Sequence, residues 1–88
     1  MKPEDTSVYS ARSIAYRNKR EFDLAIADLT KAIELEPDSA AAYYMRGLVY
    51  KVRMKYDLAI ADFRKVVLLT KDPELARPVM QEIQNLGG

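Results

Sequence analysis

Hydrophobic residues recur along this chain at intervals of three and four residues. Ala25, Leu29 and Ala32 show this spacing in one segment, and Ala59 and Phe63 show it in a later one. It is the spacing of an amphipathic α-helix, whereas a half-buried strand would alternate at every second residue. Prolines and short polar runs interrupt the pattern. The sequence therefore predicts an all-α protein with five helices, over residues 6–19, 22–35, 39–53, 56–70 and 73–86.

The connections between these segments are short, so neighbouring helices are expected to pack antiparallel. Pro78 stands inside the last segment. Because proline lacks an amide proton and disfavours helical backbone at the residue before it, we expect the last helix to be kinked or to start late.

The pattern occurs twice, with an offset of 34 residues. The hexapeptide DLAIAD stands at residues 23–28 and again at 57–62. The flanking residues keep the same offset: Tyr9, Arg12, Tyr16 and Lys31 match Tyr43, Arg46, Tyr50 and Lys65. A period of this length is typical of arrays of helix–turn–helix units.

The two aspartates of each hexapeptide do not make an acid–base pair. Five residues along a helix correspond to about 500° of rotation, so Asp23 and Asp28 point in different directions. The chain of 88 residues has no cysteine and no histidine, which excludes a cysteine nucleophile and removes the usual general base and the commonest zinc ligand. Its net charge is +1 and no apolar run approaches the ~20 residues of a membrane span. We expect a cytoplasmic protein with no enzymatic activity, no cofactor and no metal.

At this point the sequence resembles the tetratricopeptide repeat (TPR) family. The residues that carry the resemblance are YSARSIAY…FDLAIADLTKAIELEP and YYMRGLVY…YDLAIADFRKVVLL. The resemblance implies a right-handed α-solenoid of antiparallel helix hairpins in a single domain, residues 1–88, with repeats at 6–39 and 40–73 and a capping helix at 74–88. Two features depart from the family pattern. Arg20 and Met54 stand where the turn normally has glycine, which predicts less regular turns, and Pro73 lies two positions late.

The resemblance also assigns structural roles. Arg12 would pair with Asp28, and Arg46 with Asp62, in ion pairs that a neighbouring repeat can share. The small side chains of Ala25 and Ala59 would let the two helices of each hairpin approach closely.

In TPR arrays the first helix of each hairpin lines a concave surface, here called the inner face. Carried onto this chain, the inner face consists of Ser7, Ser10, Ala11, Ile14, Arg17, Asn18, Ala41, Tyr44, Met45, Leu48, Lys51, Val52, Leu75 and Val79. The lysines and asparagines of the TPR carboxylate clamp are missing at Ser10, Ile14 and Met45. We therefore expect a non-catalytic scaffold whose partly apolar groove, around Tyr44, Met45 and Leu48, binds a peptide or helix of a partner protein.

Other readings stay open. The same residues could mediate self-association or be exposed incidentally, and the chain could be an excised or engineered piece of a longer array. RNA binding is a remote alternative. Basic residues recur around the turns, at Arg17, Lys19, Arg20, Lys51, Arg53 and Lys55. Because acidic residues are nearly as numerous, a solvated charged edge is the favoured interpretation.

Overall fold

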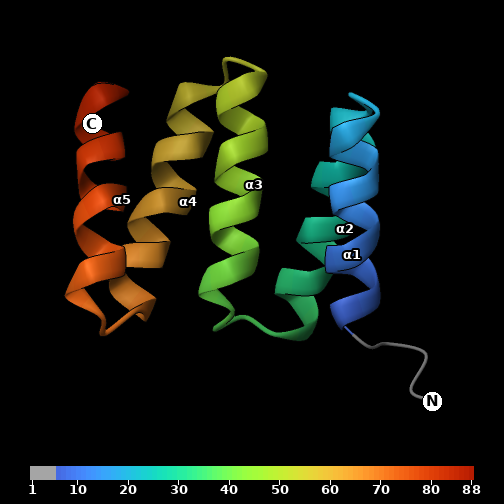
Figure 1. The fold of residues 1–88 in the computed structure, drawn as a ribbon, viewed down its shortest axis with the longest axis horizontal. Helices are drawn as coiled ribbons and strands as arrows, with labels where there is room; N and C mark the ends of the chain where they lie inside the picture. The colour runs from blue at the N-terminus through green and yellow to red at the C-terminus, as the bar shows by residue number, and fades with distance from the viewer. Residues whose placement is uncertain (1–5) are drawn as a thin grey trace.

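The computed structural model describes residues 6–88, and these form five α-helices. Their bounds are α1 Thr6–Asn18, α2 Phe22–Leu35, α3 Ala40–Val52, α4 Tyr56–Leu69 and α5 Pro73–Asn85. The helices stand side by side along the longest axis of the molecule, from α1 and α2 at one end to α5 at the other (Figure 1). Each predicted helix is present, and no end differs from the prediction by more than one residue.

The helices pack as consecutive hairpins. α1 lies against α2 and α3 against α4, while α2 also packs on α3 and α4 on α5. Every helix thus touches its neighbours in sequence, as expected for a stack of hairpins joined by short turns. The described residues make an elongated body of 39 × 28 × 17 Å.

Two helices begin at side chains that accept a hydrogen bond from their first turn. The Ser39 hydroxyl accepts from the backbone N–H of Ala42 at 3.3 Å, and the Asp72 carboxylate accepts from that of Glu74 at 3.0 Å. Pro73 follows as the first residue of α5, where its missing amide proton costs nothing. α5 then continues through Pro78, so the expected late start was wrong. Pro78 is exposed, and water can take the place of the missing amide.

The turns inside the two hairpins have the same geometry, contrary to the prediction of irregular turns. Arg20 and Met54 both adopt left-handed backbone, with φ of 62° and 59°. The residue after each donates to a carbonyl five positions earlier, from Glu21 to Tyr16 and from Lys55 to Tyr50, both at 2.8 Å. Left-handed backbone costs a non-glycine residue about 1–2 kcal/mol, but the closing hydrogen bonds satisfy the helix ends.

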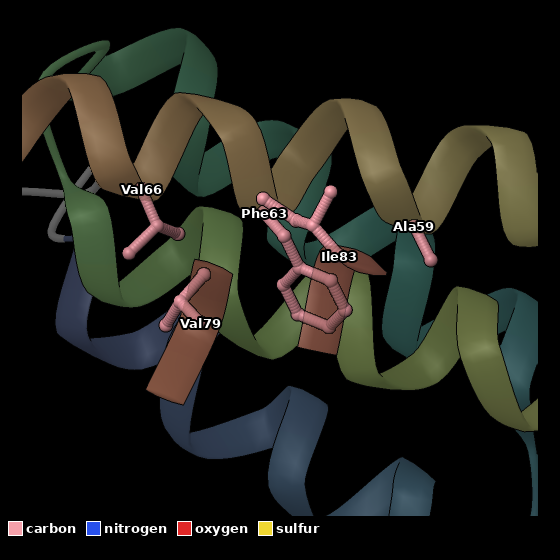
Figure 2. Packing of buried hydrophobic residues seen from close by; sticks show 5 residues of the cluster. All are labelled: Ala59, Phe63, Val66, Val79 and Ile83. Carbon is pink, nitrogen blue, oxygen red and sulfur yellow. The ribbon is translucent and has the colours of Figure 1, made fainter. Parts of the chain in front are cut away.

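The core consists of two clusters. Ala25 and Leu29 of α2 pack with Val49 of α3 in the first. The second joins α4 to α5, and Figure 2 shows its members Ala59, Phe63, Val66, Val79 and Ile83. Both alanines of the repeated hexapeptide that were expected to allow close approach are fully buried. Burial of these clusters from water is the main force that holds the stack together.

Glycine at position 47 matches the size of the aromatic ring opposite. A Cβ atom added to Gly47 would lie 2.6 Å from the ring of Phe63, closer than side-chain atoms approach. The corresponding residues in the first hairpin are Ser13, which is buried, and Leu29. A larger core residue on the second helix is thus accompanied by a smaller one on the first.

Candidate functional site

An arginine and an aspartate tie the two helices of each hairpin together, as the sequence predicts. Arg12 donates from Nε and Nη2 to the two carboxylate oxygens of Asp28 at 2.8 and 2.7 Å. Arg46 donates in the same way to Asp62, at 2.8 Å for both bonds. Such bidentate pairs fix the relative position of two elements as well as adding energy. The two ion pairs therefore fix the register of α1 against α2 and of α3 against α4.

The second pair is shared with the neighbouring repeat. The Nη1 of Arg46 donates to the hydroxyl of Thr30 on α2, at 3.1 Å. The Arg46 side chain is 17% exposed, against 54% for Arg12. Hydrogen bonds to Asp62 raise the pKa of Arg46 above its ordinary value, and the ring of Tyr43 lies 5.6 Å from its guanidinium carbon. Arg46 is therefore enclosed by protein groups and has little surface left for a ligand.

Two of the predicted inner-face residues belong to the interior. Met45 is partly buried and packs on the cluster of Ala25, Leu29 and Val49. Val79, one repeat later at the same position, is 2% exposed and packs in the second cluster. Both side chains face the preceding hairpin. Val79 is therefore buried away from the surface, whereas Met45 keeps part of its side chain exposed.

The remaining members of the inner face leave several apolar side chains in contact with solvent. The exposed fractions are 41% for Ile14, 38% for Tyr44, 52% for Val52 and 42% for Leu75. Leu48 is partly buried against the second cluster. The ring centroid of Tyr44 lies 5.9 Å from that of buried Phe63, with the two rings tilted by 47°. These exposed side chains lie on α1, α3 and α5, the helices that the TPR resemblance assigns to the inner face.

The polar inner-face residues differ in their partners. Ser10 and Arg17 are partly buried, and Asn18 is exposed at the end of α1. Lys51 donates to a carboxylate oxygen of Glu82 on α5 at 3.0 Å, so this lysine links α3 to α5.

The sequence interpretation missed two shallow pockets at the turns inside the hairpins. Both begin at the residue with left-handed backbone and continue into the first turn of the next helix. One, of about 260 Å³, is lined by Arg20, Glu21, Phe22, Asp23, Leu24 and Arg53. The other, of about 370 Å³, is lined by Met54, Lys55, Tyr56, Asp57 and Leu58. The available sequence signal for these pockets was the leucine repeated in each DLAIAD hexapeptide. In the structure this leucine is 47% exposed in both copies.

Part of the basic edge at these turns is engaged within the protein. Arg53 lies 3.7 Å from a carboxylate oxygen of Asp23, and the guanidinium carbon of Arg20 lies 5.6 Å from the ring centre of Phe22. Among residues 6–88 no three acidic side chains gather closely enough to hold a metal ion. Within the same residues no helix has the length and apolar character to cross a membrane.

The repeated hairpins agree with family comparisons. Two family models match, one described as "TPR repeat" over residues 14–51 and one as "Tetratricopeptide repeat" over residues 40–73. The chain belongs to the tetratricopeptide repeat family. No curated protein matches it in sequence.

Solved TPR structures have the same fold. The solution structure of a TPR domain protein from Salinibacter ruber superimposes with a TM-score of 0.87 at 19% identity, covering 100% of this chain and 92% of the other. The first TPR of Spaghetti (RPAP3), solved with an HSP90 peptide, gives 0.76 at 23% identity, covering 93% and 68%. YrrB, described as a TPR protein with an unusual peptide-binding site, gives 0.74 at 28% identity, covering 96% and 52%. These likenesses place the chain among helical-repeat solenoids.

Proposed function

We propose that residues 1–88 act as one TPR domain, a non-catalytic scaffold that binds a peptide or helix of a partner protein on its inner face. The observation that carries the proposal is a set of exposed apolar side chains on α1, α3 and α5, namely Ile14, Tyr44, Val52 and Leu75. Soluble proteins rarely leave such side chains together on one surface unless they contact another molecule.

The arrangement suits an elongated ligand. α1, α3 and α5 are held in fixed register by buried clusters and by the Lys51–Glu82 ion pair, so the inner face is preorganised. A rigid surface lowers the entropic cost of binding a flexible peptide. Two of the similar structures, Spaghetti and YrrB, are themselves described as binding peptides. That precedent supports a protein or peptide as the partner of this chain.

The proposal is tested by selecting short random peptides, displayed on phage, against the folded protein. Binding of the selected peptides is then compared between the wild type and two variants, Tyr44→Glu on the inner face and Leu58→Glu on α4. Both substitutions place a carboxylate at a comparably exposed apolar position, with exposed fractions of 38% and 47%. Val52→Glu serves as a second inner-face variant that leaves the Phe63 contact intact, and thermal melts establish that each variant folds.

We expect Tyr44→Glu and Val52→Glu to weaken peptide binding by about tenfold or more, because each buries a charge under the ligand. Leu58→Glu should bind as the wild type does. Loss of binding in Leu58→Glu alone would assign the ligand to the pocket at the α3–α4 turn. Failure to select any peptide would contradict the proposed function.

A second candidate function, self-association, has an observation of its own. Val49 on α3 is 1% exposed because it packs on Ala25 and Leu29 of α2, and Ala42, seven residues earlier on the same side of α3, is 2% exposed. One repeat earlier, Val8 is 52% exposed and Ala15 is exposed too. This side of α1, here called the end face, thus has the character of an internal interface without a covering helix among the described residues. We propose a second copy of the chain as the occupant, since the end face continues the α2–α3 interface.

Light scattering over a concentration series tests this second candidate. If the end face joins two copies, the mass should approach that of a dimer at high concentration and return to that of a monomer in Val8→Glu. Leu68→Glu, at a position 79% exposed on α4, is the control and should leave the mass unchanged. A monomer at every concentration would exclude self-association and leave the end face without this role.

A further inference from the structure

The two halves of the inner face differ in charge at equivalent positions. In the second half, Lys51 of α3 faces Glu82 of α5, 31 residues further along the chain, and the two form an ion pair at 3.0 Å. One repeat earlier, the corresponding residues are Arg17 of α1 and Leu48 of α3. The cation is kept in the first half, but its acidic partner is replaced by an apolar residue.

Arg17 consequently has no counter-charge among residues 6–88. Within residues 6–88 the ion pairs join other residues, and no carboxylate lies within 4.0 Å of its guanidinium. Arg17 is partly exposed, and Ile14 precedes it by three residues on the same helix. Leu48 holds on α3 the position that Glu82, the partner of Lys51, holds on α5. A guanidinium beside apolar side chains is well suited to a bidentate contact with a carboxylate, because it offers paired donors and is weakly hydrated.

We infer that the inner face recognises a carboxylate of the bound peptide next to an apolar side chain, with Arg17 as the ion-pair partner. The inference rests on the proposed function and adds the chemistry of the ligand. The peptide carboxylate occupies the place that Glu82 takes against Lys51 in the other half of the stack. The apolar side chain lies against Leu48 and exposed Tyr44. The specificity of the surface is therefore for an acidic, partly apolar segment.

Arg17 also has a local role, because it stands in the last turn of α1, where a cation complements the helix dipole. Lys51 stands in the last turn of α3 and forms its ion pair all the same. The dipole role predicts an effect of Arg17 on helix stability. It predicts no effect on which peptides bind, and the experiment below uses this difference.

The test is a selection of random peptides displayed at the C-terminus of a phage coat protein, so that acidic side chains and a free chain end are both available. It is carried out on the wild type, on Arg17→Glu and on Arg64→Glu. Arg64 is an exposed cation on α4, and its substitution changes the net charge by the same amount. Arg17→Gln is the milder variant for the case in which Arg17→Glu does not fold, as judged by thermal melts.

Wild type and Arg64→Glu should enrich peptides with a carboxylate beside an apolar residue, whereas Arg17→Glu should enrich peptides with lysine or arginine at that place. A selected acidic peptide should bind Arg17→Glu at least about tenfold more weakly than the wild type. Arg17→Gln should lose the acidic preference without acquiring a basic one. Synthesis of the peptide with an amidated end, and separately with glutamine for glutamate, identifies which carboxylate is read.

The outcomes separate the inference from the function on which it rests. If peptides bind, and Tyr44→Glu abolishes binding while Arg17→Glu keeps the wild-type charge preference, the inference is overturned and the proposed function stands. If the wild type enriches no acidic peptides, the inference is overturned as well. If no peptide is selected at all, both fall.

Discussion

Replacing Gly47 by alanine is expected to destabilise the protein although alanine is the better helix former. The added Cβ would lie 2.6, 2.9 and 3.2 Å from three ring atoms of Phe63. Phe63 is 0% exposed, so its ring cannot move aside without opening the α4–α5 core. Overpacking costs about 1–3 kcal/mol, and a contact as short as 2.6 Å belongs in the upper part of this range, about 2–3 kcal/mol. The helix preference of alanine offsets about 1 kcal/mol. The net loss of unfolding free energy should be about 1–2 kcal/mol.

Thermal and urea denaturation followed by circular dichroism measure this loss. For a domain of this size each kcal/mol corresponds to about 4–8 °C in the melting temperature. Phe63→Leu reproduces the leucine of the first hairpin, Leu29, and should make room for the new methyl group. The double variant Gly47→Ala/Phe63→Leu should therefore be more stable than the sum of the single variants predicts, by about 1 kcal/mol.

Ser13→Ala provides the matched control, because the first hairpin already accommodates a Cβ at the position equivalent to Gly47. This variant removes only the hydrogen bond from the Ser13 hydroxyl to the carbonyl of Ser10, 2.6 Å long. Its unfolding free energy should stay within about 1 kcal/mol of the wild type. If Gly47→Ala were as stable as the wild type, or if the double variant were additive within about 0.5 kcal/mol, the proposed close approach of α3 and α4 would be refuted.

Three further predictions concern the turns, the hairpin contact and the ion pairs. Met54→Gly should raise the unfolding free energy by about 0.5–1 kcal/mol, measured by urea denaturation, because glycine adopts left-handed backbone without strain. Arg53→Gly, at a position with negative φ, should lower the unfolding free energy. Equal effects of the two substitutions would contradict the account. Ala59→Leu should cost about 1–3 kcal/mol in the same assay, since its site is 0% exposed, and a neutral result would show that the helices can separate. Arg46→Ala should cost about 2–3 kcal/mol, because it leaves a buried aspartate unpaired. Arg12→Ala should cost less, since Arg12 is 54% exposed, and the reverse order of the two would be inconsistent with the sharing of Arg46 between repeats.

The sequence was a good guide to features that repeat. Helical spacing predicted the five helices, and the period of 34 residues paired Arg12 with Asp28 and Arg46 with Asp62, because the signals of the first four helices occur twice in the same register. The regular geometry of the turns was not predictable from residue type. Met54 has no intrinsic preference for left-handed backbone, and the closing hydrogen bonds impose it there.

The candidate site was harder to predict than the fold. Helical spacing separates a buried side from an exposed one, but it does not say which helix covers a given side. Met45 and Val79 were therefore assigned to the surface, although the preceding hairpin packs on both. The charge difference between the halves of the inner face became visible only when the structure showed that Lys51 pairs with Glu82, because the residues one repeat earlier are Arg17 and Leu48.

The most direct measurement of the central claim is the change in backbone amide NMR shifts when a selected peptide is added to the wild-type protein. If the inner face is the binding surface, the largest changes should occur along α1 and α3, around Ile14, Arg17 and Tyr44. Amides around Leu24 and Leu58, at the pockets of the hairpin turns, should change little. The opposite pattern, with the largest changes at those turns and none along the inner face, would contradict the account.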